Sequence, residues 1–125
     1  MFELTVEMPF SAAHRICGHE GPCANLHGHN YRALITVTGD RLNELGMLVD
    51  FGEMKRICAE VIAPLDHSYL NDIAEFAAAN PTAEAIARHV FRGVAARAAD
   101  SGLEALRVSR VAVFESDRSS ATYWE

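Results

Sequence analysis

The sequence predicts an α+β fold in which a four-stranded antiparallel sheet carries two helices on one face, in the order ββααββ. Two stretches of alternating apolar and polar residues come first, two stretches with helical spacing follow, and two further strand-like stretches end the chain. Strands grouped on either side of a run of helices are typical of a two-layer sandwich, because one sheet face can then bury both helices.

The length and composition are those of an ordinary globular chain. Its 125 residues fit one domain, which we expect to span residues 1–125, and 50% of them are hydrophobic while 22% are charged. No apolar run approaches the roughly 18 residues of a membrane span, and no basic and apolar leader begins the chain, so we expect a cytoplasmic protein without membrane contact. The net charge of −6 leaves no basic stripe, which argues against nucleic-acid binding.

The first two strands flank a long segment. Residues 2–10 and 29–38 alternate strictly enough to predict half-buried strands. The apolar positions are Phe2, Leu4, Val6, Met8 and Phe10 in the first stretch and Tyr31, Ala33, Ile35 and Val37 in the second. Residues 11–28 between them are too many for a hairpin loop of about 2–5 residues, and they are rich in His, Cys and Gly. Long loops often carry function, so this segment is expected to hold part of the site.

Two helices follow. Asp50 and Glu53 are spaced as a helix-start pair, and Pro64 ends the run. The inner positions of this first helix are Phe51, Met54, Cys58, Val61 and Ile62. The second helix is expected from Asn80-Pro81-Thr82 to about Ala99, with Gly102 beyond its end. Its inner stripe holds Ile86, Val90 and Val94, and its outer face holds Arg88, Arg92 and Arg97.

Two more strands complete the sheet. Residues 106–115 and 119–125 have strand character, and residues 116–118 supply the turn between them. The sheet face opposite the helices would carry Glu3, Thr5, Glu7, Arg32 and Thr36. Those side chains favour water or polar partners, and an open sheet leaves two edges to cover, so we expect a symmetric homo-oligomer.

Three histidines are candidate metal ligands. His27 and His29 point to the same side if a strand begins there, and His14 ends the first strand. If the two strands pair antiparallel, all three imidazoles meet at one end of the sheet. Three imidazoles with a fourth position open are the arrangement of catalytic zinc, so zinc is the expected ion. A His-Gly-His sequence alone is a common accident, and the convergence with His14 is what favours metal binding.

Cys23 is the candidate base or nucleophile, because its loop places it beside these histidines. A free thiol is mostly protonated at neutral pH and needs a nearby cation, metal or imidazolium to become reactive. Cys58 is expected to be a buried member of the first helix, and the odd count of 3 cysteines argues against a disulfide framework. Cys17 and His19 form an alternative metal-binding pair, but a thiolate would close the metal's open position, so we treat them as bystanders.

Three further positions have two readings each. Asp66-His67 can be a proton relay, in which the carboxylate orients the imidazole, or a simple turn or helix cap. Glu115 ends an apolar strand, where it is either solvated, which the sequence alone favours, or held for a partner with two adjacent N–H donors. His89 lies inside the second helix and is expected to be exposed or packed.

Several separated motifs occur in a fixed order along the chain. They are Phe10-Ser-Ala-Ala-His14, Cys23-x-x-x-His27-Gly-His29-Asn-Tyr31, Leu65-Asp-His67, Pro81-Thr-Ala-Glu84 and Phe114-Glu115-Ser. Together they resemble the 6-pyruvoyl-tetrahydropterin synthase and 6-carboxytetrahydropterin synthase family, from near residue 3 to the end. The resemblance implies the tunnelling fold, whose subunits close their sheets into barrels by trimerisation and commonly form hexamers.

The resemblance also implies roles for individual residues. By it, His14, His27 and His29 are the zinc ligands, Cys23 is the proton acceptor, Asp66 and His67 are its relay partners, Glu115 anchors the pterin ring and Thr82 is a secondary pterin contact. No arginine can be assigned to the triphosphate. Pro22 departs from the family pattern, in which a basic residue commonly precedes the cysteine, and this bears on thiol acidity or triphosphate contact.

The interval between the thiol and His-Gly-His resembles that of bacterial 6-carboxytetrahydropterin synthases. This implies a zinc-dependent lyase that converts 7,8-dihydroneopterin triphosphate to 6-carboxy-5,6,7,8-tetrahydropterin, with release of acetaldehyde and triphosphate, in the biosynthesis of queuosine and other 7-deazapurines. The nearest alternative is a 6-pyruvoyl-tetrahydropterin synthase, which eliminates triphosphate and typically has a longer interval. A second alternative is a non-catalytic zinc- or pterin-binding module, which would need the histidines and Glu115 but not Cys23.

Overall fold

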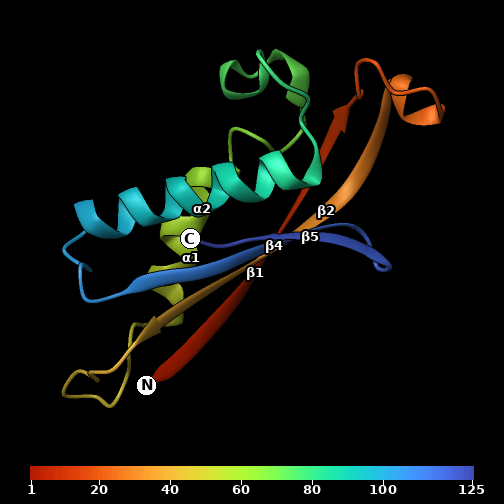
Figure 1. The fold of residues 1–125 in the computed structure, drawn as a ribbon. Helices are drawn as coiled ribbons and strands as arrows, with labels where there is room; N and C mark the ends of the chain where they lie inside the picture. Colours follow the sequence, from red (N-terminus) through yellow and green to blue (C-terminus); the bar gives the residue numbers. More distant parts are fainter.

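A computed structural model describes all 125 residues and shows an α+β architecture (Figure 1). The elements are β1 (Phe2–His14), β2 (His27–Gly39), α1 (Phe51–Ile62), β3 (Ser68–Tyr69), α2 (Ala83–Asp100), β4 (Arg107–Ser116) and β5 (Ser119–Tyr123), with short 3-10 turns at Pro22–Ala24, Leu70–Asp72 and Ala74–Phe76. The predicted fold class and the two helices are confirmed. The predicted four-stranded antiparallel sheet and the order ββααββ are wrong in one respect each, because the sheet is mixed, with five strands in the order β3-β1-β2-β4-β5, and β3 lies between the two helices in the chain. The added strand, β3, pairs in parallel with β1 and is too short to show any periodicity.

The first two strands form one long antiparallel ladder. Their register runs without interruption from Phe2 opposite Gly39 to His14 opposite His27. The first strand therefore extends four residues beyond the predicted end at residue 10, and the connecting loop is residues 15–26. This extension carries His14 along the same face as Phe10 and Ala12, all three of which are buried.

Both helices cover the same face of the sheet, as expected (Figure 1). The Asp50 carboxylate caps α1 by accepting from the N–H groups of Gly52 and Glu53, and the Thr82 hydroxyl caps α2 by accepting from Ala85 N–H. The predicted inner stripe of α2 is fully buried at Ile86, Val90 and Val94. In α1 one predicted core position is wrong: Phe51, directly after the cap, is 55% exposed.

The sheet face away from the helices carries polar side chains that pair with one another. Arg32 lies 2.7 Å from Glu7 and stacks over the ring of Phe114, and Arg110 lies 3.1 Å from Glu3. The Thr36 hydroxyl bonds to that of Thr5 at 2.9 Å and is only 3% exposed, so this face is less open than the sequence suggested.

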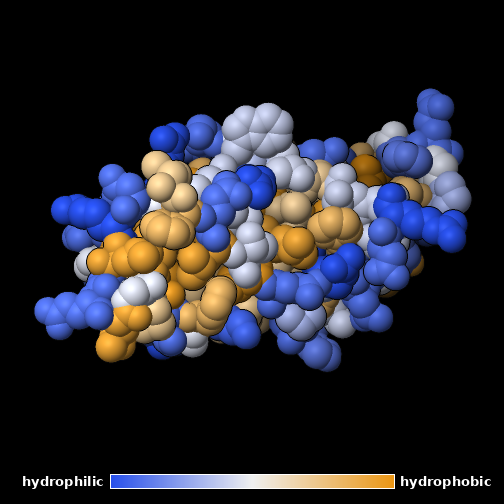
Figure 2. Space-filling model, turned by 90° about the horizontal axis from the view of Figure 1, so that it is seen from below, coloured by the Kyte–Doolittle hydropathy of each residue, from blue (hydrophilic) through white to orange (hydrophobic).

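Apolar surface is concentrated toward one end of the molecule (Figure 2). Phe2, Leu42 and Phe51 are exposed there and line one groove. This is the end at which the chain begins, opposite the loop that joins β1 to β2 (Figure 1). No helix combines the length and apolar character needed to cross a membrane.

Candidate metal centre and active site

The predicted convergence of three histidines is confirmed. His14 ends β1 directly opposite His27, the first residue of β2, and His29 follows two residues later on the same face. One ligand atom from each ring lies within 4.8 Å of the others, a grouping that could hold a metal ion. The ring centroids of His14 lie 4.5 Å from His27 and 5.1 Å from His29.

Backbone carbonyl groups fix the orientation of two of these rings. The Nδ1 atom of His14 lies 2.8 Å from the carbonyl oxygen of Pro81, and the Nδ1 atom of His27 lies 2.7 Å from that of Asn25. A carbonyl oxygen only accepts, so each Nδ1 carries the proton and donates it. The lone pair then resides on Nε2, which is the arrangement that prepares histidine to bind a metal.

The buried imidazole nitrogens also fit a cation. The Nε2 atoms of His14 and His29 are buried and have no hydrogen-bond partner, which costs about 1–3 kcal/mol for each unsatisfied group. Burial lowers the pKa of His29, and the neighbouring His14 and His27 lower it further, while Glu115 opposes the shift. The neutral imidazole is the form that coordinates metal, so this environment favours His29 as a metal ligand.

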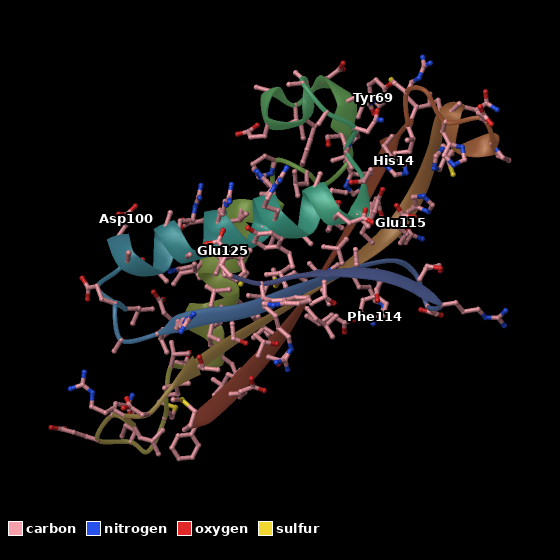
Figure 3. All side chains as sticks on the ribbon, viewed as in Figure 1. His14, Tyr69, Asp100, Phe114, Glu115 and Glu125 are labelled. Carbon is pink, nitrogen blue, oxygen red and sulfur yellow. The ribbon has the colours of Figure 1, made fainter.

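Glu115 lies close to two of the histidines and is only partly exposed to solvent. Its two carboxylate oxygens lie 4.0 Å from His14 Nε2 and 3.9 Å from His29 Nε2, and its side chain is 30% exposed. A register shift between Phe114 and Ser116 places Glu115 in a bulge at the end of β4. Figure 3 shows the labelled His14 and Glu115 near the start of α2.

Cys23 and Thr82 line the same cavity as the three histidines and Glu115, with a volume of about 430 Å³. Cys23 lies in the 3-10 turn Pro22–Ala24 of the loop, and Thr82 is the cap of α2. Two segments far apart in sequence thus meet over the histidines. Sequence reasoning missed Ser119 and Ser120 of β5, which also line the cavity; small polar residues at a strand start carry no distinctive signal.

Asp66 and His67 contact each other but do not line this cavity. Asp66 Oδ1 lies 2.9 Å from His67 Nδ1 and accepts the backbone N–H of Ser11 at 2.9 Å. The Ser11 N–H lowers the pKa of Asp66, and His67 lowers it further. His67 is 83% exposed and lines a neighbouring pocket with Ser11 and Asn30, which shares only His29 with the cavity of Cys23. The paired geometry of a relay is present, whereas its proximity to Cys23 within one chain is not.

The remaining histidines and thiols lie outside the metal grouping. His19 lines the cavity, but its Nδ1 accepts the N–H of Gly21 at 2.8 Å, and Cys17 is exposed. Cys58 is fully buried, as predicted, and burial raises the pKa of its thiol to about 12. His89 packs against Phe76 with ring centroids 5.5 Å apart.

This α+β chain gathers three histidines, a thiol and a carboxylate around one cavity. Such a site is typical of an enzyme that acts on a small-molecule substrate, and its histidines could hold a metal ion. The chain belongs to the family described as 6-pyruvoyl tetrahydropterin synthase, whose model matches residues 3–125. The family resemblance inferred from the sequence motifs is thereby confirmed.

Relatives with established names agree with this assignment. The chain is 37% identical to the 6-carboxy-5,6,7,8-tetrahydropterin synthase of Synechocystis, over 99% of this chain and 94% of the relative. It is 38% identical to a protein of Archaeoglobus fulgidus described as a putative 6-carboxy-5,6,7,8-tetrahydropterin synthase, over 90% and 86% of the two chains. Among solved structures, the 6-pyruvoyl tetrahydropterin synthase of Caenorhabditis elegans superposes with a TM-score of 0.81 at 26% identity, covering 100% of this chain and 97% of that one.

Proposed function

We propose that this protein is a zinc-dependent 6-carboxy-5,6,7,8-tetrahydropterin synthase. It converts 7,8-dihydroneopterin triphosphate and one water molecule to 6-carboxy-5,6,7,8-tetrahydropterin, acetaldehyde and triphosphate, and serves the biosynthesis of queuosine and other 7-deazapurines. The observation that carries the proposal is the meeting of Cys23 with three histidines and Glu115 in one cavity. The shared name of the relatives in Synechocystis and Bacillus subtilis supports the carboxy-forming reaction.

His14, His27 and His29 would hold the zinc ion through three imidazoles and leave a fourth position for substrate. The buried, unpartnered Nε2 atoms and the lowered pKa of His29 support this choice of ligands. When bound, zinc supplies Lewis-acid chemistry that makes the hydroxyl groups of the substrate side chain more acidic.

The protein side chains would orient the substrate and move its protons. The two oxygens of Glu115 match the two adjacent N–H donors on the guanidine-like edge of a pterin, and Glu115 lies 3.9–4.0 Å from the Nε2 atoms of His29 and His14, so the proposed anchor and the metal ligands share one site. Thr82, which lines the same cavity, would be a secondary pterin contact. Cys23 then removes a proton from, and returns one to, the carbons next to the ring.

Asp66 and His67 would complete the relay from a neighbouring copy of the chain. Their separation from the Cys23 cavity within one chain supports such an arrangement, because a relay must lie within hydrogen-bond reach of the group it serves. The open outer edge of β5 supports it as well, because an unpaired strand edge is a surface on which another copy can pair. A trimer-based homo-oligomer, with a hexamer as its expected form, would supply these contacts.

Product analysis tests the proposed reaction. Purified zinc-loaded protein is incubated with 7,8-dihydroneopterin triphosphate, and volatile aldehydes are trapped and identified by mass spectrometry. We expect acetaldehyde in a 1:1 ratio with 6-carboxytetrahydropterin. A pyruvoyl product without acetaldehyde would instead support 6-pyruvoyl-tetrahydropterin synthase, the activity named for the structural neighbour in Caenorhabditis elegans.

A second comparison separates an enzyme from a binding module. Cys23→Ala is expected to retain zinc and abolish turnover, whereas Cys17→Ala, which changes an exposed thiol in the same loop, should leave turnover near wild type. Undiminished turnover in Cys23→Ala would remove the thiol from the mechanism. Absence of turnover in the wild-type protein, with zinc and pterin both bound, would favour a binding module.

A further inference from the structure

One edge of β1 pairs with β2, and the other edge is covered by hydrogen bonds to groups within residues 66–80. Ser11 donates its N–H to Asp66 Oδ1 at 2.9 Å and accepts the N–H of His67 on its carbonyl oxygen. Ala13 then pairs with Tyr69 in β3. Beyond β3 there is no strand, although the chain continues along the same edge at residues 15 and 17.

Two asparagine side chains take the place of the missing strand. Asn71 accepts the N–H of Arg15 on Oδ1 and donates Nδ2–H to its carbonyl oxygen, both at 3.0 Å. Asn80 does the same for Cys17, at 2.8 Å and 2.9 Å. A carboxamide carries an acceptor oxygen and a donor N–H side by side, as the C=O and N–H groups of one strand residue are, so each side chain reproduces the pairing of a strand residue.

These amides fix the backbone that holds Cys23. In an extended chain the N–H and C=O groups of successive residues point to opposite sides, so Arg15 and Cys17 face the asparagines while Ile16 faces the other way. There the N–H of Ile16 donates to the carbonyl oxygen of Cys23 at 2.7 Å. Both sides of Ile16 are thereby fixed, and Cys23 is held at the cavity by a backbone bond.

The same segment supports a histidine ligand. Asn80 directly precedes Pro81, whose carbonyl oxygen receives the Nδ1–H of His14. One short stretch at the start of α2 therefore supports both the loop of Cys23 and a candidate metal ligand. The two supports are independent contacts, because His14 also belongs to the continuous ladder between β1 and β2.

We propose that Asn71 and Asn80 are positioning residues that hold the Cys23 loop in its reactive place; the kinetic part of this inference rests on the proposed role of Cys23 as proton acceptor. Removing either amide frees the backbone at Arg15 or Cys17 and lets Cys23 move relative to the substrate. A displacement of about 1 Å can lower a rate by about 100-fold. Substrate affinity should change little, because Glu115 lies on β4 and the Thr82 hydroxyl is held by Ala85 N–H inside α2, not by either asparagine side chain.

The test compares Asn71→Ala and Asn80→Ala with the matched control Asn43→Ala. Asn43 also accepts two backbone N–H groups, from Leu45 and Met47, but in the loop after β2 at the other end of the sheet. We expect kcat to fall about 10- to 100-fold in the first two variants, with KM within about threefold and zinc content unchanged. Asn80→Asp keeps the acceptor and loses the donor, so its kcat should lie between those of Asn80→Ala and the wild type.

Two measurements do not depend on turnover. In the unaltered protein the amides of Arg15 and Cys17 should exchange with deuterium far more slowly than that of Gly18, and Asn80→Ala should remove the protection at Cys17. The rate at which iodoacetamide alkylates Cys23, followed by peptide mass spectrometry, should change in Asn80→Ala and not in Asn43→Ala. These results stand even if the enzyme makes a different product.

The proposal is overturned by any of three results. These are unprotected amides at Arg15 and Cys17 in the unaltered protein, a wild-type kcat in both alanine variants, or an equal loss of kcat in Asn43→Ala. If Asn80→Ala does not fold, exchange in the unaltered protein and kinetics of Asn80→Asp decide the question.

Discussion

The Nδ1 atom of His14 lies 2.8 Å from the carbonyl oxygen of Pro81, a residue 67 positions further along the chain. This bond joins the end of β1 to the start of α2 and leaves the Nε2 atom of His14 facing the other two imidazoles. The orientation of the candidate ligand is therefore set by the fold, before any metal arrives. In such a site, substitution of a residue that binds the metal should lower the zinc content, whereas substitution of a residue that only lines the cavity should not.

The first prediction concerns metal content. His27→Ala and His29→Ala should each lose most of the zinc, which in the wild-type protein should amount to about one ion per chain, because two imidazoles remain where catalytic zinc has three. Elemental analysis after gel filtration measures the ratio. His19→Ala is the matched control, since His19 lines the same cavity outside the metal grouping, and it should keep its zinc. Stoichiometric zinc in both His27→Ala and His29→Ala would refute the assignment.

Substrate anchoring is tested at Glu115. Glu115→Gln keeps the shape of the side chain and removes the charge that accepts two N–H donors, so KM should rise about 10- to 100-fold, in line with the loss of charge-assisted hydrogen bonds. Steady-state kinetics and zinc analysis give the two readouts, and zinc should stay bound. Asp117→Asn changes a 93% exposed carboxylate two residues away and should leave KM unchanged. Equal effects in the two variants would mean that Glu115 is not the anchor.

Sharing of active sites between copies is tested by mixing inactive variants. Cys23→Ala lacks the thiol and His67→Ala lacks the relay, so co-refolded mixtures should regain about a quarter of wild-type activity if each site takes these groups from two different chains at random. Native mass spectrometry verifies that mixed assemblies form. Cys23→Ala mixed with His27→Ala, which lacks a metal ligand, should regain none, because Cys23 and His27 line one cavity of one chain. Mixed assemblies of the first pair without activity would contradict the shared relay.

The buried thiol of Cys58 predicts a pH dependence. Burial raises its pKa from 9.0 to about 12. A pKa that is higher in the folded state contributes stability below pH 9, and that contribution is lost as pH rises from about 9 through about 12. At pH 8 a disulfide reagent should label Cys17 and Cys23, and Cys58 only after unfolding in urea. In Cys58→Ala the alkaline loss of stability should be smaller. Labelling of Cys58 in the native protein at the rate of Cys17 would contradict its burial.

Much of the fold could be predicted because long elements repeat their pattern many times. The alternation in β1 and β2 and the stripe of α2 each extend over several periods, and Asp50 and Thr82 mark helix starts by local chemistry. The two-residue β3 could not be predicted, since it has no period and forms only because β1 offers a free edge. Phe51 illustrates another limit: its helical spacing fits the core, but its place in the first turn leaves it exposed.

The part of the site that depends on residue type and on the alternation of side chains along a strand could be predicted. Alternation along β2 places His27 and His29 on the same face, and the antiparallel pairing of β1 with β2 places His14 beside them. Alternation along β4 puts Glu115 on the face of Val111 and Val113, but its closeness to the histidines could not be predicted, because it depends on the pairing of β4 with β2. Asn71 and Asn80 were missed for a different reason. Their partners are backbone groups more than 50 residues away, so nothing local to either asparagine indicates the contact.

The uninterrupted register of β1 limits how the length of this chain can vary. A strand places alternate side chains on opposite faces, so inserting or deleting one residue between Phe2 and His14 would exchange the two faces from that point on. His14 would then leave the cavity and Ala13 would enter it. Insertions and deletions are expected to be accepted in residues 40–46, which lie outside the sheet and before the buried Val49 and the helix cap Asp50, because no side chain there has to stay in register with the metal ligands.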